Sequence, residues 1–431
     1  MSDPTTPDDT AQVAAWLDDL ARREMAIEAI AALGSRAIDP LASYLEHGPQ
    51  PVSQSRVLAV EMLGRLHDAR VPKLLRKLLR AQPLHDLPPE LFESEYRVKD
   101  AAIKALVTQQ NATENDVAWG IQSERLPSAV RAAGTLGLAS LLPSIVGLLT
   151  DDVLAAPAES ALQALRPESI RPLLAAIQAW LDPSQDTPRI RLALIRAFRW
   201  LAAANVTVTE NLTDQALDHA SPMVQGAAAL VVRDRQAPSI VAALLHGALS
   251  KEPLLAFDCR DRLQEVEQPL VEPALEALHI DRETDVYGNA HASDIWGRYW
   301  LLTRLLQLTR HDAASLYRVM AVVSEGELVA GLHRWTSPSA ISLKALLRHP
   351  DSHVRAAAAA AVERLEPFET GHWLADRLGD RDRHVRRQAY AVLRHRIQAR
   401  HIRLSRADIP LWAWCLHPLK CMHLLLLSRC P

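Results

Sequence analysis

The strongest constraint on the fold is a repetition near the end of the chain. The segment DSHVRAAAAAAVERLEP at residues 351–367 returns thirty-one residues later as DRHVRRQAYAVLRHRI at residues 382–397. Both segments begin Asp-x-His-Val-Arg and carry small or apolar residues three and seven positions after the Arg. These two positions lie on one face of a helix. Small residues there allow a neighbouring helix to approach closely, so the segments predict a repeated, closely packed helix.

The same pattern recurs along the chain, and a second marker follows it. Matches start at Arg56, Lys99, Arg131, Arg191 and Gln225, and looser ones at Ala26, Ala158 and Arg260. A proline opens another apolar run after most of them, at Pro40, Pro72, Pro143, Pro172, Pro238 and Pro273. Proline suits the first turn of a helix, where its missing N–H is not needed. Two helices in a period of about 33 residues predict an all-α fold, an α-solenoid of stacked helix pairs.

The pattern resembles the HEAT repeat, and most closely the bacterial subtype that is also found in phycobilin lyases. The resemblance rests on Asp-x-x-Val-Arg-x-x-Ala-x-x-x-Leu and is sharp only over residues 351–396. Asp351 and Asp382 each precede a helix and can cap its free N–H groups. The resemblance implies that Arg355 and Arg386 belong to a polar ladder between repeats, and hence that they are structural. Ligand binding by these two Arg residues is the alternative.

The distribution of charge along the chain indicates which class of partner the protein binds. The net charge is -3, but residues 1–343 hold 32 Lys and Arg against 43 Asp and Glu, whereas residues 344–406 hold 14 against 7. This balance argues against nucleic acid as the partner and predicts an acidic protein surface facing the basic region. The candidate contacts are Arg383, Arg387 and Arg394. A merely solvated polar face is the alternative, and nucleic acid or anionic lipid is a lesser one.

Breaks in the repeat suggest the organisation of the chain. We expect an N-terminal segment (1–19), a repeat array (20–280), a loop and irregular helical insertion (281–343), basic repeats (344–406) and an apolar capping tail (407–431). Residues 82–97 contain three prolines and also interrupt the repeat. Trp296, Tyr299 and Trp300 lie together in the insertion and are either a binding hot spot or core residues. The tail should dock as the second helix of the last pair and cover residues 385–393.

The sequence offers little for catalysis. It has no phosphate-binding loop, no Gly-x-Ser-x-Gly and no His-Glu dipeptide, and the His-Asp dipeptides at residues 85–86 and 311–312 lack the further His and Asp residues that a metal phosphohydrolase needs. The tail carries Cys415, His417, Cys421 and His423, but their spacing is unusual for zinc. We therefore expect no catalytic residues, no metal and no cofactor.

The expected function is that of a non-enzymatic scaffold or adaptor that binds another protein. The alternative, implied by the resemblance, is a lyase or chaperone that handles a prosthetic group on a partner protein; a nucleic-acid-binding protein of HEAT type is less favoured. The first ten residues lack the apolar core of a signal peptide, and the chain has no apolar run of about 18 residues. We therefore expect a cytoplasmic protein without a membrane span.

Overall fold

The structure, a computed structural model, describes most of the chain. The described residues are 7–47, 53–234, 237–266, 270–278, 282–284, 290–292, 295–309, 313–334, 340–365, 371–399, 406–409 and 411–429. The chain divides into two compact units, Met1–Thr207 and Val208–Pro431. The boundary lies inside the repeat array predicted for residues 20–280.

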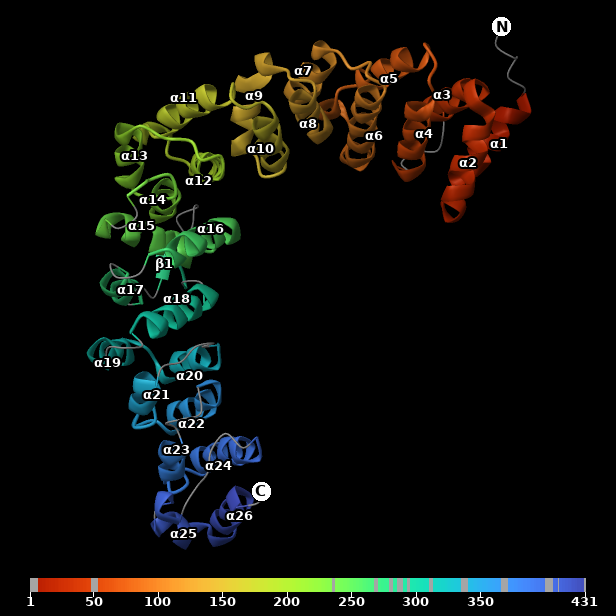
Figure 1. Ribbon diagram of the computed structural model, residues 1–431. Coiled ribbons are helices and arrows are strands. Elements are labelled where there is room, and N and C mark those ends of the chain that lie inside the picture. The colour runs from red at the N-terminus through yellow and green to blue at the C-terminus, as the bar shows by residue number, and fades with distance from the viewer. Residues whose placement is uncertain are drawn as a thin grey trace. The chain divides into compact units, whose positions relative to one another are not determined.

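The first unit consists of helices packed in two rows (Figure 1). In chain order they are α1 (Pro7–Asp18), α2 (Arg23–Leu33), α3 (Ile38–His47), α4 (Ser53–Arg65), α5 (Val71–Leu79), α6 (Pro89–Thr108), α7 (Glu114–Gln122), α8 (Pro127–Thr135), α9 (Leu142–Gly147), α10 (Ala155–Ala164), α11 (Ile170–Trp180) and α12 (Pro188–Ala203). Helices α4, α6, α8 and α10 pack successively in one row, and α5, α7, α9 and α11 lie in the other.

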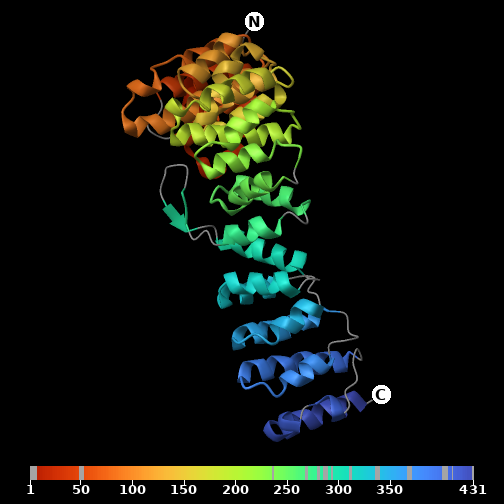
Figure 2. The same ribbon diagram turned by 90° about the vertical axis from the view of Figure 1, so that its left-hand side faces the viewer.

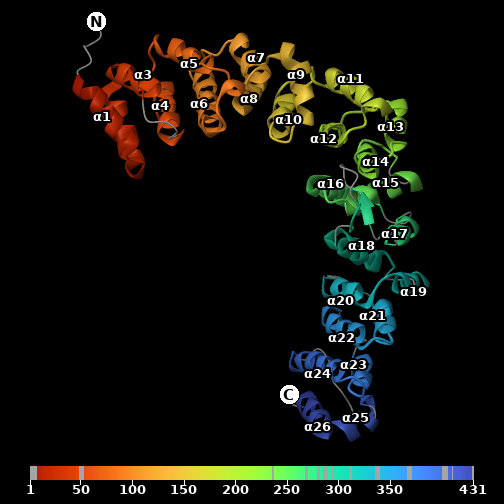
Figure 3. The ribbon, with the colours of Figure 1, turned by 180° about the vertical axis from the view of Figure 1, so that it is seen from behind.

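The second unit repeats this arrangement (Figure 3). Its helices are α13 (Glu210–Leu217), α14 (Pro222–Ala229), α15 (Pro238–Leu249), α16 (Pro253–Gln264), α17 (Val271–Leu278), α18 (Ile295–Leu308), α19 (Ala313–Val322), α20 (Glu325–Arg334), α21 (Ala340–Leu346), α22 (Ser352–Ala361), α23 (Gly371–Arg377), α24 (Arg383–Gln398), α25 (Leu411–Leu416) and α26 (Pro418–Arg429). Even-numbered helices from α14 to α26 form one row, and odd-numbered helices from α15 to α25 form the other. Figure 2 shows the resulting layers within this unit.

Short elements join some of the helices. The 3-10 turns are η1 (Leu20–Arg22), η2 (Gly34–Ala37), η3 (Leu84–Asp86), η4 (Ala139–Leu141), η5 (Leu148–Thr150), η6 (Pro183–Gln185), η8 (Val362–Arg364) and η10 (Arg406–Asp408). Strands β1 (Arg282–Thr284) and β2 (Ala290–Ala292) pair antiparallel, with Glu283 opposite His291.

The two sequence markers coincide with the two rows. The predicted prolines all lie in the first turn of helices α3, α5, α9, α11, α15 and α17. The residues three and seven positions after the repeated Arg are fully buried in α4, α6, α12 and α24. Each first helix therefore covers its neighbours with the predicted face, and the all-α solenoid is confirmed.

The helix with the Arg marker is the first helix of its repeat, and the helix with the proline is the second. Long side chains join the first helices of successive repeats. Arg364 donates to the carbonyl oxygens of Leu332 and His333 at the end of α20, at 2.9 and 2.8 Å. Equivalent contacts reach the ends of α4, α14, α16 and α22, and their donors are Gln109, Arg262, Arg304 and Arg396. The last carbonyls of a helix lack a partner within the helix. These contacts supply one from the next repeat.

Between residues 281 and 343, where the sequence predicts a loop and an irregular helical insertion, the described helices continue the stack. Helix α18 packs between α17 and α20, and α19 packs against α17 and α21, so both rows continue through this region. Leu301, Leu305 and Leu316 are fully buried in these contacts. Arg298, Leu301 and Leu305 in α18 have the spacing of the repeated Arg and its two buried residues, whereas α20 is identified as part of the stack by its packing.

The tail also differs in part from its prediction. Helix α26 packs against α24, as expected for a covering helix, but it lies in the same row as α24 instead of pairing with it. Cys421 and Leu424 are buried. Leu419, Met422 and Leu426, which share one face at spacings of three and four, are 84%, 53% and 58% exposed. The tail therefore extends the row and leaves an apolar face of its own.

A close approach of two helices in the second unit gives a testable prediction. A Cβ atom on Gly226 in α14 would lie 2.7 Å from the Cα of Gly247 in α15. We expect Gly226→Ala to lower the free energy of unfolding by about 1–3 kcal/mol, because the two helices must separate. In Gly326→Ala on α20, the new Cβ meets open space. This control should be neutral or stabilising by up to about 1 kcal/mol. Urea denaturation measures both variants, and equal stabilities would contradict the prediction.

Candidate binding surfaces

Arg355 connects two successive repeats. Its guanidinium donates to both carboxylate oxygens of Asp380 at 2.9 Å, and to the carbonyl oxygens of His349 and Pro350 at 2.8 and 2.7 Å. The Asp380 side chain is 5% exposed. Burial alone would raise the pKa of this carboxyl, but the hydrogen bonds from Arg355 and from the backbone N–H of Asp382 outweigh burial and hold the pKa below its ordinary value.

Arg386 repeats the backbone half of this arrangement. It donates to the carbonyl oxygens of Asp380 and Arg381, which lie six and five residues earlier, as the acceptors of Arg355 do. In place of a carboxylate it contacts Nε2 of His417 at 3.0 Å. Asp351 and Asp382 accept N–H groups in the first turns of α22 and α24. All four residues therefore make contacts within the stack.

Arg383, Arg387 and Arg394 differ from these residues because all three are exposed. Their spacings of four and seven residues place them on one face of α24. Arg386 and Arg396, on other faces of the same helix, are engaged with backbone carbonyls. The Arg-rich segment is therefore divided between structural side chains and one exposed basic face.

A groove lies beside this basic face, over helix α22. Residues 356–361 are six consecutive alanines, and Ala356, Ala357 and Ala360 line the groove. The longer side chains of α20 and α24 form its walls, and the groove has a volume of about 430 Å3. The remaining lining residues are Val329, His333, His353, His384, Arg387 and Gln388. We call this feature the alanine groove. It exists because a helix of small side chains lies between two helices of larger ones.

The polar lining of the alanine groove is basic or neutral. Arg387 and three histidines line it, and none of the described residues in its lining carries a carboxylate. The rings of His353 and His384 stack with centroids 6.4 Å apart. The floor is apolar, so the groove combines methyl groups below with cationic and protonatable groups at the sides. This combination suits a peptide segment that carries carboxylates.

The three aromatic candidates lie on α18. Tyr299 and Trp300 are partly buried, and the side chain of Trp296 lies outside the described residues. Neither Tyr299 nor Trp300 lines the alanine groove. Both predictions for these aromatic residues, a binding hot spot and a place in the core, therefore stay open.

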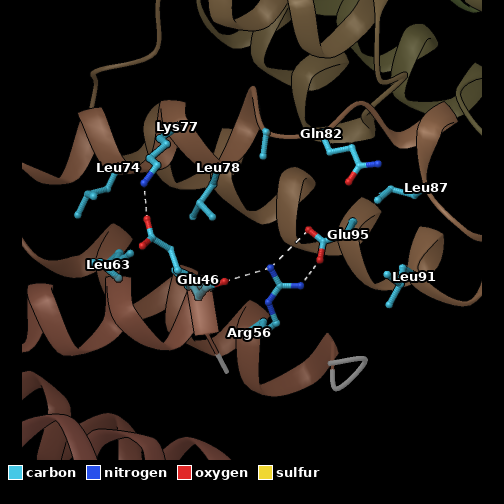
Figure 4. A pocket seen from close by; sticks show the side chains of 13 residues that line it. Glu46, Arg56, Leu63, Leu74, Lys77, Leu78, Gln82, Leu87, Leu91 and Glu95 are labelled. Atoms are coloured by element: carbon cyan, nitrogen blue, oxygen red, sulfur yellow. Dashed lines mark hydrogen bonds and ion pairs between the residues drawn. The ribbon is translucent and has the colours of Figure 1, made fainter. Parts of the chain in front are cut away.

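A second cavity lies in the first unit. The only sign of it in the sequence is the interruption of the repeat at residues 82–97, which forms part of its wall. Its volume is about 270 Å3, and six leucines line it: Leu45, Leu63, Leu74, Leu78, Leu87 and Leu91. Figure 4 shows these side chains around two ion pairs, Glu46–Lys77 and Arg56–Glu95. Gln82, Leu87, Leu91 and Glu95 come from the interrupting segment 82–97, so we call this cavity the insertion pocket.

A buried ion pair fixes the interrupting segment in place. The Lys99 ammonium donates to Oε1 of Glu124 at 2.8 Å and to the carbonyl oxygen of Gln82 at 2.9 Å. The other carboxylate oxygen of Glu124 accepts the N–H of Leu84 at 3.1 Å. The side chains of Lys99 and Glu124 are 1% and 0% exposed. The wall of the insertion pocket is therefore tied to α6 and to the end of α7.

The residues weighed for chemistry are dispersed. His85 and Asp86 are both exposed, and His311 and Asp312 lie outside the described residues. In the tail, His417 contacts Arg386, His423 contacts the hydroxyl of Tyr390, and Cys421 is buried. Among the described residues, no group of three or more His, Cys, Asp and Glu is placed to hold a metal ion.

None of the helices described here is both long enough and apolar enough to cross a bilayer.

No family model and no curated protein matches the chain. Among solved structures, the chain is similar to the UNC-45 chaperone, a protein described as binding and folding muscle myosin, at 14% identity and a TM-score of 0.24. That match covers 98% of this chain and 51% of the chaperone, so the chain spans about half of its length. An engineered protein matches at 16% identity over 97% of this chain and 93% of its own, with a TM-score of 0.18. The assignment to the helical-repeat proteins therefore rests on the two rows of stacked helices.

Proposed function

We propose that this chain is a non-enzymatic scaffold that binds an acidic segment of another protein in the alanine groove. The observation that carries the proposal is the lining of the groove: alanine methyl groups form its floor, Arg387 and three histidines lie beside them, and no described lining residue is acidic. A segment that presents Asp or Glu finds complementary charge there, while its apolar atoms cover the floor.

The exposed basic face extends this site along α24. Arg383 and Arg394 lie on the same face as Arg387, so a bound segment that runs along α24 meets more than one guanidinium. Charges at the edge of an interface act mainly on the association rate and on its salt dependence. The proposed complex is therefore sensitive to ionic strength.

The proposal includes the type of repeat. We assign the helix pairs to the HEAT type, and the contacts of Arg355 support this assignment, because they join an Arg of one repeat to Asp380 before the next first helix. The second Arg keeps the same backbone acceptors.

Charge reversal tests the proposed function. The probe is a fluorescein-labelled 16-residue peptide of alternating Glu and Ala, and the readout is fluorescence anisotropy at low and at physiological salt. We expect the triple variant Arg383→Glu, Arg387→Glu and Arg394→Glu to bind the peptide at least about tenfold more weakly than wild type, because attraction is replaced by repulsion. Circular dichroism should show unchanged helicity.

The matched control changes three exposed basic residues of the first unit, Arg65, Lys73 and Lys104, to Glu. This control has the same net charge as the test variant and should keep its affinity. A peptide with Gln in place of Glu should not bind. If both triple variants lose affinity equally, or if salt has no effect on binding, the proposed site is wrong.

A further inference from the structure

The insertion pocket has the features of a site for an uncharged ligand. Both of its acidic side chains face a basic partner within the pocket, Glu46 with Lys77 and Glu95 with Arg56, so the lining carries no net charge. A charged ligand would have to compete with these pairs. A neutral apolar group would leave both pairs intact and replace water against leucine side chains.

The walls of the pocket leave apolar surface available. Leu74, Leu78, Leu87 and Leu91 are only partly buried, although they belong to three different elements: α5, the segment after η3, and the start of α6. The lining leucines of α5, Leu74 and Leu78, are four positions apart, as are Leu87, Leu91 and Glu95 in the interrupting segment, which is the spacing of a helical face (Figure 4). The faces converge on one cavity without filling it.

The size of the pocket decides between classes of ligand. Sites for free small-molecule ligands have volumes of about 300–1,000 Å3 and enclose most of the ligand. This cavity has about 270 Å3 and accepts one large side chain. Buried pockets of this kind receive the Trp, Tyr or Leu anchors on which protein interfaces depend.

We propose that the insertion pocket is a second protein-binding site, which receives one large, uncharged apolar side chain from an uncharged stretch of a partner. The interrupting segment 82–97 is then a functional addition to the repeat, because it contributes Gln82, Leu87, Leu91 and Glu95 to the wall. The buried Lys99–Glu124 pair holds that wall in place before the partner arrives. The site is independent of the alanine groove, which lies in the other unit.

The first test uses N-phenyl-1-naphthylamine, a neutral apolar probe of side-chain size whose fluorescence rises on binding. We expect Ala42→Phe, which fills the pocket from α3, to weaken probe binding at least about tenfold. Ala81→Phe fills it from beyond the end of α5 and should do the same. Ala356→Phe, in the alanine groove, is the matched control and should leave probe binding unchanged. Circular dichroism checks that every variant is folded.

The second test identifies the kind of partner. Random twelve-residue peptides displayed on phage are selected on the wild type and counter-selected on Ala42→Phe. Supporting peptides carry a Trp, Phe or Leu on an uncharged stretch, displace the probe, and still bind the triple Glu variant of α24. Acidic peptides that no longer bind the triple Glu variant are ligands of the alanine groove and say nothing about the insertion pocket. Probe binding that Ala42→Phe and Ala81→Phe leave unchanged overturns the site. Probe binding that no selected peptide displaces overturns the assignment to a protein partner.

Discussion

Replacing Lys99 with Met is expected to lower the free energy of unfolding of the first unit by about 3–5 kcal/mol. The substitution leaves the Glu124 carboxylate, which is 0% exposed, without its ammonium partner. It also removes the donor to the carbonyl oxygen of Gln82 and a cation–π contact with Trp119 at 5.1 Å. The buried Glu124 carboxylate keeps the N–H of Leu84, but it has lost its hydration and its ion-pair partner, which is costly.

Urea denaturation followed by circular dichroism measures this loss, and hydrogen exchange of residues 82–126 locates it. The matched control is Lys77→Ala, which breaks the exposed pair with Glu46 and should cost no more than about 1 kcal/mol. The double variant Lys99→Met, Glu124→Leu should recover part of the stability, because it removes both buried charges. A Lys99→Met variant as stable as the Lys77→Ala control would show that the pair is not important for folding.

The second large effect is expected at Arg355 in the second unit. Arg355→Met should cost about 3 kcal/mol, because it removes two hydrogen bonds to the buried Asp380 and leaves the carbonyl oxygens of His349 and Pro350 without this donor. Arg377, at 3.6 Å from Asp380, is only a partial substitute. The matched control is Arg383→Met on the exposed face of α24, which should change stability by no more than about 0.5 kcal/mol. Thermal or urea denaturation of both variants compares them.

The pH dependence of this effect follows from Asp380. Its pKa is depressed in the folded protein, so its contribution to stability is present above the ordinary carboxyl pKa and is lost as the pH falls through the folded value. The difference in stability between wild type and Arg355→Met should therefore be largest near neutral pH and should shrink below about pH 4. A difference that stays constant down to pH 2 would mean that the Asp380 ion pair is not its source.

The helix pairs could be predicted from the sequence because the information for them is local. A proline in the first turn of each second helix, and small or apolar residues three and seven positions after the repeated Arg, both act within a single helix. In a stack of repeats each helix contacts only its neighbours, so a local pattern that recurs also predicts the packing. The end contacts of Arg364 and Arg396 follow the same rule, because each reaches one repeat back.

The binding surfaces depend on residues that no local pattern connects. The sequence shows six consecutive alanines at 356–361, but the groove above them requires the larger side chains of α20 and α24 on either side. It shows three prolines at 82–97 as an interruption, but the pocket also requires leucines from α3, α4 and α5. The sequences of α20 and α26 lack the repeat marker, so only the packing of these helices shows in which row they lie. The sequence by itself determined the helices and their pairing, since these depend on neighbours in the chain. Only the tertiary structure decided where side chains leave space between helices, since that space depends on the side chains of three or more elements at once.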